Sequence, residues 1–259
     1  MAPPDDLGSV SGLALPAPDA VLRYTAHEDG LVDVHLPSGS PGSVPRLVVL
    51  LHGGFWRQAF DRRHTRAVAA ALAGEGYVVA TPEYRRVGGG GGWPMTGDDV
   101  EAALTAMPGL LDGLGVGTHG TTLLGHSAGG HLALWAASLP RAVDLGVDLV
   151  VGLAPVGQLR AAARDRVGEG AVQALLGGEP AEVAERYDAA DPAFRFRTRP
   201  GCDVRVVHGT RDDVVPPANS LELAAEHPFV ELRLVEGADH FDLMNPTSTA
   251  WPAVLDALR

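Results

Sequence analysis

The chain has 259 residues, 46% of them hydrophobic, and a formal net charge of -12, which argues against a nucleic-acid partner because such a partner needs a basic face. All 20 basic residues are arginine, since the sequence contains no lysine. Schiff-base chemistry, a Walker-type phosphate loop and a Ser-Lys dyad are therefore excluded. The single cysteine, Cys202, allows no disulfide within the chain and is expected to be a small core residue.

The N-terminal residues 1–19 are rich in proline, alanine, serine and aspartate and predict a mobile arm. They lack the basic and apolar segments of a secretion signal. No stretch reaches the roughly 18 consecutive apolar residues of a membrane-spanning helix. We therefore expect a cytoplasmic protein without membrane contact, with residues 20–259 forming one domain, and we leave a homodimer open.

The first regular elements after the arm are two short strands. Residues 21–25 and 31–36 alternate between apolar and polar positions and predict a hairpin at an antiparallel edge. Residues 47–51 are continuously apolar, as is typical of a strand buried on both faces of a parallel sheet. From this point the chain alternates between strands and helices, which predicts a mostly parallel sheet with helices on both faces.

The remaining elements follow from the same periodicities. Strands are predicted over 77–80, 121–124, 147–153, 204–208 and 230–235, and helices over 61–73, 98–114, 131–137, 217–226 and 249–258. Residues 158–198 predict two or three short helices without a strand. The run 88–92 lacks the spacing of a phosphate loop and predicts a flexible loop, and Arg85 is expected to pair with Asp98 or Asp99.

The segment Gly125-His126-Ser127-Ala128-Gly129-Gly130 lies between a predicted strand and a predicted helix. A G-x-S-x-G pattern in that setting is typical of a nucleophile elbow, in which a tight turn exposes the serine and its neighbours must be glycine. Ser127 is therefore the candidate nucleophile.

A serine hydroxyl needs a base within hydrogen-bond reach, and the base needs a carboxylate to orient it. His240 follows the last predicted strand and is the candidate base. Asp212 and Asp213 follow the strand before it. Their segment resembles the arrangement H-G-x-x-D-x-x-V-P that is usual in α/β-hydrolases. With Val215-Pro216 as the anchor, that resemblance implies Asp212 as the acid, with Asp213 as the alternative. The other histidines have no metal-ligand spacing, so neither a metal nor a cofactor is expected.

The oxyanion of a tetrahedral intermediate must be met by backbone N–H groups. Ala128 is one candidate donor, because it follows the nucleophile at the start of a helix. Gly53 and Gly54 are the others, since they lie in the loop after residues 47–51 and allow close approach to a substrate. The next two residues, Phe55 and Trp56, either contact a planar substrate group or pack beneath the loop as core.

From about residue 20 the chain resembles an α/β-hydrolase of the esterase/lipase superfamily. That resemblance implies an eight-stranded, mostly parallel sheet with an antiparallel N-terminal edge and a small helical cap at about 158–198. The segments His52-Gly53-Gly54-Phe55-Trp56 and 125–132 resemble the H-G-G-x-W and G-H-S-A-G-x-H-L signatures of kynurenine formamidases (arylformamidases). They depart at Phe55 and His126 from the H-G-G-G and G-D-S-A-G-G of hormone-sensitive-lipase-like esterases.

The resemblance implies a serine hydrolase that removes a short acyl group from a small-molecule ester or aryl formamide, such as N-formylkynurenine, through an acyl-enzyme. A general carboxylesterase and a non-catalytic ligand-binding protein on the same fold stay open as alternatives. A peptidase of the prolyl-oligopeptidase type is disfavoured, because no propeller domain precedes the candidate catalytic residues.

Overall fold

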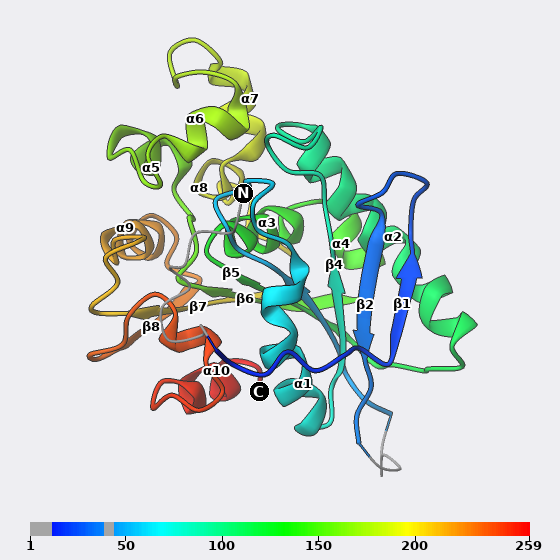
Figure 1. The fold of residues 1–259 in the computed structure, drawn as a ribbon. Coiled ribbons are helices and arrows are strands. Elements are labelled where there is room, and N and C mark those ends of the chain that lie inside the picture. The colour runs from blue at the N-terminus through cyan, green and yellow to red at the C-terminus, as the bar shows by residue number, and fades with distance from the viewer. Residues whose placement is uncertain (1–11, 39–43) are drawn as a thin grey trace.

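The computed structural model describes residues 12–38 and 44–259, so most of the predicted arm lies outside the described residues. Its centre is an eight-stranded sheet in the order β1-β2-β4-β3-β5-β6-β7-β8 (Figure 1). The strands are β1 (Ala20–Arg23), β2 (Leu31–His35), β3 (Leu47–Leu51), β4 (Val78–Pro82), β5 (Thr121–His126), β6 (Val147–Leu153), β7 (Asp203–Gly209) and β8 (Val230–Val235). The β1–β2 and β2–β4 pairs are antiparallel and the others are parallel, which confirms the predicted sheet.

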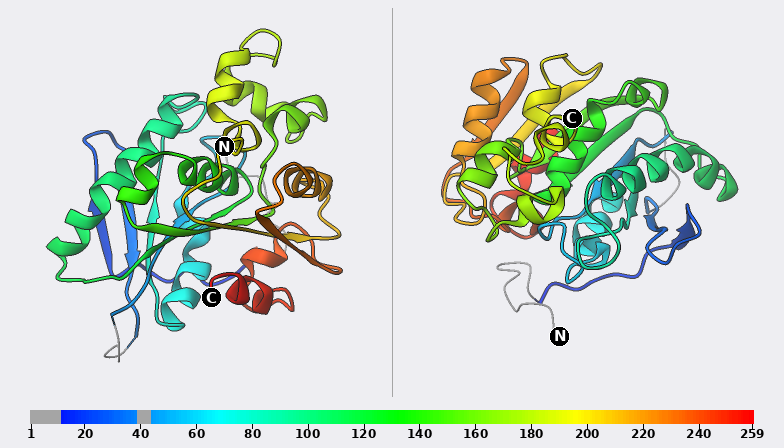
Figure 2. Two further views of the ribbon diagram at one scale, coloured as in Figure 1. Left: turned by 180° about the vertical axis from the view of Figure 1, so that it is seen from behind. Right: turned by 90° about the horizontal axis from the view of Figure 1, so that it is seen from above.

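Strand β3 shows how the sheet separates two cores. Val49 and Leu51 belong to one hydrophobic cluster and Val48 and Leu50 to another, because successive side chains of a strand point to opposite faces. The helices lie on both sides of the sheet accordingly (Figures 1 and 2). They are α1 (Arg66–Gly74), α2 (Met95–Gly113), α3 (Ala128–Ala137), α4 (Arg141–Asp144), α9 (Ala218–Glu226) and α10 (Trp251–Ala257), with two 3-10 turns, η2 (Arg62–Thr65) and η3 (Asp242–Met244).

The insertion between β6 and β7 forms the helical cap. Within it lie four short helices, where the sequence predicted two or three: α5 (Leu159–Arg164), α6 (Ala171–Leu176), α7 (Ala184–Ala190) and α8 (Pro192–Arg195). None exceeds seven residues, so none shows enough turns for its periodicity to be resolved in the sequence. The cap stands beside α3 and α9 (Figures 1 and 2).

Asp99 of α2 is the partner of Arg85. The Arg85 Nε and Nη2 atoms lie 2.8 and 2.7 Å from the two carboxylate oxygens of Asp99. This bidentate pair joins α2 to the segment after β4, and it decides between the two acidic residues that the sequence left open.

Candidate active site

Ser127 occupies a strained turn between β5 and α3. Its φ of 54° and ψ of -118° lie in a region that residues with a side chain rarely adopt. A Cβ at Gly125 would lie 2.1 Å from the carbonyl oxygen of Gly129, and one at Gly129 would lie 2.1 Å from that of Leu51. Both positions therefore require glycine. The turn is held by a 2.9 Å hydrogen bond from the Ser127 N–H to the carbonyl of Leu153.

Asp212 and His240 meet where β7 and β8 end. The His240 Nδ1 donates to Asp212 Oδ2 over 2.6 Å, which leaves Nε2 as the acceptor nitrogen of the ring. Asp212 Oδ1 accepts from the N–H groups of Val214 and Val215 over 2.9 and 2.8 Å. Asp213 is exposed. The structure thus brings Asp212, and not Asp213, to the histidine.

A second histidine contacts the same carboxylate. His208 Nε2 lies 3.2 Å from Asp212 Oδ2 and 2.9 Å from the carbonyl of Val215. Both are acceptors, so Nε2 carries the proton, and Nδ1 accepts from Ser220 Oγ over 2.7 Å. Burial alone would raise the pKa of Asp212, but the hydrogen bonds from His208 and His240 outweigh it and hold that pKa well below its usual value. Asp212 is therefore an anion at neutral pH.

The predicted oxyanion residues surround Ser127. A Cβ on Gly53 would lie 3.2 Å from the Ser127 Cβ, and Gly54, with φ of +109°, lines the same cavity as the serine. Ala128 is the first residue of α3, where helix N–H groups have no partner within the helix. All three backbone segments are thus close to the hydroxyl-bearing residue.

A cavity of about 60 Å³ contains the candidate site. Its lining combines the polar groups with a largely apolar wall: Gly54, Phe55, Phe60, His64, His126, Ser127, Val214, His240, Phe241 and Met244. A wider groove of about 640 Å³ adjoins it beneath the cap, because Phe55, Phe60, Val214 and Phe241 line both. The site therefore consists of a small inner cavity and a broad outer groove.

The sequence of this chain matches a known protein family. A sequence profile of the BD-FAE family matches residues 32–226. The chain belongs to the BD-FAE family. The matched span contains Ser127 and Asp212, and it ends before His240.

Other similarities of this BD-FAE member agree with the fold. Esterase LipC of Mycobacterium tuberculosis is 28% identical over 244 residues, and the match covers 85% of this chain but 59% of LipC. A truncated carbohydrate esterase from gut microbiota superposes with a TM-score of 0.76 at 19% identity, over 92% of this chain and 94% of that one. The propionate-bound esterase Est2 of Thermogutta terrifontis superposes with a TM-score of 0.72 at 21% sequence identity, over 92% of this chain and 91% of that one. These structures share the α/β-hydrolase fold of this chain.

Residues 52–56 form a loop after β3 that we call the glycine loop. Its two aromatic residues have different environments in this BD-FAE chain. Phe55 lines both the cavity and the groove. It packs so closely on the cap that a Cβ at Gly168 would lie 2.3 Å from its ring, and Arg57 donates a hydrogen bond to the Gly168 carbonyl. Trp56 is 1% exposed and packs edge-on against His131, with ring centroids 5.2 Å apart. The expectation of substrate contact is therefore withdrawn for Trp56, because its ring lies in the core.

Two further residues line the inner cavity and carry no signal in the sequence. Met244 comes from η3 and His64 from η2, segments that no motif marks. Burial and the neighbouring His52 lower the pKa of His64 to about 4, so its ring is neutral at physiological pH. The cavity wall thus includes a neutral imidazole in addition to His240.

Outside this cavity the described residues offer few alternatives for chemistry. Across 12–38 and 44–259, no group of three or more histidine, cysteine, aspartate or glutamate residues could hold a metal ion. Within the same ranges, no helix is long and apolar enough to cross a membrane. Cys202 is buried and unpaired, and burial raises the pKa of its thiol to about 11, which makes it a poor nucleophile.

Proposed function

We propose that this chain is a serine hydrolase of the carboxylesterase class, with Ser127 as nucleophile, His240 as general base and Asp212 as the orienting acid. One observation carries the proposal. A strained elbow serine lines the same cavity as a histidine whose Nδ1 is 2.6 Å from a buried carboxylate, so that its Nε2 is available to accept a proton. The esterase names of the relatives point to the same class.

The reaction follows from these positions. The Ser127 Oγ attacks the carbonyl carbon of the substrate while its proton passes to His240 Nε2. The N–H groups of Gly53, Gly54 and Ala128 stabilise the oxyanion. The bond to the leaving group then breaks, and that group takes the proton from Nε2. Water attacks the resulting acyl-enzyme by the same route, which releases the acid and regenerates Ser127.

The size of the inner cavity supports a short acyl group. A buried water needs roughly 10–15 Å³ of such space, so a cavity of about 60 Å³ holds on the order of five non-hydrogen atoms. A formyl, acetyl or propionyl group fits this limit, and a long fatty acyl chain does not. We therefore propose formate, acetate and propionate derivatives as the substrate class.

The entrance to the cavity supports an aromatic leaving group. Three of the six phenylalanines of the chain, Phe55, Phe60 and Phe241, line both the cavity and the groove. Aromatic rings pack favourably against one another in offset or edge-on arrangements. We propose an aryl ester or aryl formamide on this ground, with N-formylkynurenine as the candidate formamide.

A substrate panel tests both parts of the proposal. We expect kcat/KM to be higher for p-nitrophenyl acetate than for p-nitrophenyl laurate, and a fluorophosphonate probe to label the wild-type protein but not a folded Ser127→Ala variant. Measurable turnover of N-formylkynurenine above background would support the formamide. Laurate as the best ester would refute the short-acyl proposal. A wild-type protein that neither reacts with the probe nor turns over any substrate would favour the non-catalytic alternative.

A further inference from the structure

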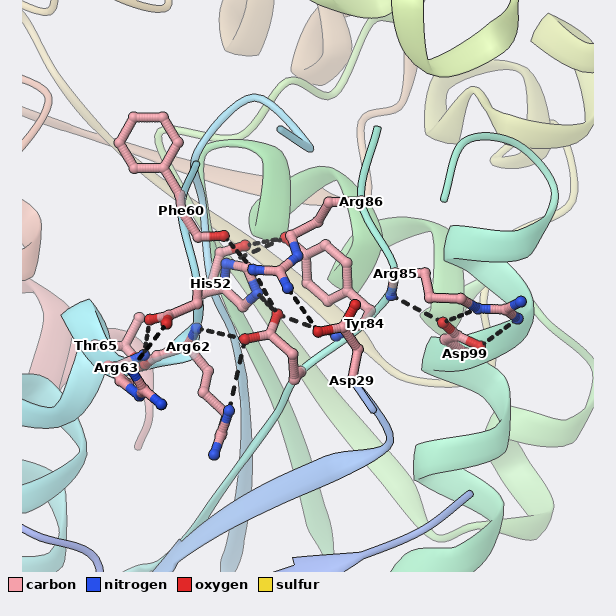
Figure 3. Close-up of polar contacts among 12 residues, drawn as sticks. Asp29, His52, Phe60, Arg62, Arg63, Thr65, Tyr84, Arg85, Arg86 and Asp99 are labelled. Carbon is pink, nitrogen blue, oxygen red and sulfur yellow. Dashed lines mark hydrogen bonds and ion pairs between the residues drawn. The ribbon is translucent and has the colours of Figure 1, made fainter. Parts of the chain in front are cut away.

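A buried contact between His52 and Glu83 lies next to Gly53, and Figure 3 shows His52 among the surrounding polar side chains. His52, the residue after β3, places its Nε2 2.7 Å from the Oε1 of Glu83, which follows β4. The two side chains are 0% and 2% exposed. Tyr84 stacks on the His52 ring with centroids 4.3 Å apart, and its hydroxyl donates to the His52 carbonyl over 2.7 Å. The ring is therefore held from several sides.

Both nitrogens of His52 face acceptors. Its Nδ1 lies 2.8 Å from the carbonyl oxygen of Gly53, which can only accept, so Nδ1 carries a proton. Its Nε2 faces Glu83, and that carboxylate is ionised. The backbone N–H groups of Arg62 and Tyr84 donate to it over 3.0 and 3.2 Å, and an Arg86 nitrogen lies 3.3 Å away. Both ring nitrogens of His52 thus lie within hydrogen-bond distance of an oxygen acceptor.

The ionisation of Glu83 has a clear physical cause. Burial by itself would raise the pKa of Glu83, but His52 and Arg86 outweigh this and lower it to about 2. Arg62 of η2 also lies near Glu83, with its Nη1 3.7 Å from Oε2, and the rings of His64 and Tyr84 pack against the His52 ring. Glu83 is thus an anion at neutral pH, 2.7 Å from the Nε2 of His52.

The proton on Nδ1 sets the direction of a peptide group. A trans peptide is planar, and its C=O and N–H point in opposite directions. The Gly53 carbonyl points to His52, so the N–H of Gly54 points away from it, and Gly54 lines the cavity with Ser127. A hydrogen bond to the carbonyl also polarises the peptide and strengthens its N–H as a donor.

We propose that Glu83 is a positioning residue for the oxyanion site. By keeping His52 protonated on both nitrogens, it fixes the Gly53–Gly54 peptide with its N–H directed at the cavity. This inference rests on the proposed function, because it assigns the Gly54 N–H to the oxyanion. The protonation of His52, however, can be measured without any substrate.

The first experiment measures that protonation in the intact wild-type protein. Long-range ¹H–¹⁵N NMR of the imidazole rings distinguishes a doubly protonated ring from either neutral tautomer. The His52 signals are assigned by their loss in a His52→Gln variant. We expect both His52 nitrogens to be protonated near neutral pH. A neutral His52 would overturn the proposal, whatever the protein hydrolyses.

The second experiment separates positioning from general stability. Glu83→Gln should lower kcat for p-nitrophenyl acetate by roughly 10- to 100-fold with KM changed less than about threefold, since loss of a whole oxyanion donor costs about 10²–10³. It should also remove one His52 ring proton. Glu83→Asp, which keeps the charge, should recover part of the rate.

The matched control is Asp33→Asn, because Asp33 is equally buried and pairs with Arg62 and Arg66. This variant should melt at a lower temperature but keep kcat within about threefold of wild type. A folded Glu83→Gln protein with unchanged kcat, or an equal loss in Asp33→Asn, would overturn the proposal. If the wild type hydrolyses nothing, the proposed function fails, and the NMR result still decides the state of His52.

Discussion

Replacing Asp212 with asparagine should disable the site while leaving its shape intact. The N–H groups of Val214 and Val215 donate to Oδ1 of Asp212, so they hold the new amide with its oxygen in that place. The amide nitrogen then stands where Oδ2 lies now, 2.6 Å from His240 Nδ1. A donor at this position requires Nδ1 to be unprotonated. The proton therefore moves to Nε2, which can no longer accept the proton of Ser127.

The magnitude follows from that change of tautomer. Loss of the orienting carboxylate with retained geometry lowers kcat about 10⁴-fold, which corresponds to about 5 kcal/mol in the activation free energy. His208 Nε2 also donates toward the replaced oxygen, 3.2 Å away, so the variant loses stability as well.

The assay is the kcat of p-nitrophenyl acetate hydrolysis, with circular dichroism to show that each variant is folded. Asp213→Asn is the matched control, because this neighbouring carboxylate is exposed, and its rate should stay within about threefold of wild type. A folded Asp212→Asn protein that retains a tenth of the wild-type kcat, or a larger loss in Asp213→Asn, would refute the assignment of the acid.

Three further outcomes are expected. Met244→Ala should enlarge the inner cavity, so that it accepts the two additional methylenes of a butyryl group. The ratio of kcat/KM for p-nitrophenyl butyrate to that for p-nitrophenyl acetate should therefore rise roughly tenfold. An unchanged ratio would contradict this expectation. EDTA should have no effect on the activity, and a loss in EDTA that a divalent ion restores would refute the metal-free mechanism. Burial raises the pKa of Asp191 to about 6, against about 3.9 in an unfolded chain. Ionisation of Asp191 therefore destabilises the folded state by about 3 kcal/mol. This destabilisation is absent below about pH 4 and complete above about pH 6. The free energy of unfolding of Asp191→Asn relative to wild type, measured in urea, should thus rise between about pH 4 and pH 7, and a difference independent of pH would show that Asp191 is not buried as an acid.

The sheet could be predicted because its strands have clear periods. Residues 47–51 form a run of five apolar positions, and the structure buries all of them on two faces. Ser127, Asp212 and His240 could be expected together because each follows a strand, and the carboxyl ends of parallel strands meet at one edge of a sheet. In the sequence only a pattern distinguishes Asp212 from Asp213, whereas in the structure the Val214 and Val215 N–H groups orient the Asp212 carboxylate.

Contacts between distant segments could not be predicted in this way. Phe55 and Trp56 are adjacent and both aromatic, and the sequence does not show that Trp56 packs in the core against His131 of α3. Glu83 follows a strand like many surface acids, and its partnership with His52 arises because β3 and β4 lie side by side. A pattern along one segment contains no information about the segment that will face it.

The contact between the cap and the glycine loop has a consequence for movement. Arg57 and Phe55 join the loop to Gly168, so a cap that swings outward breaks a hydrogen bond and uncovers an aromatic ring in the same step. Any displacement of the cap therefore disturbs the residues next to Gly54, so the outer groove and the loop that lines the inner cavity change shape together.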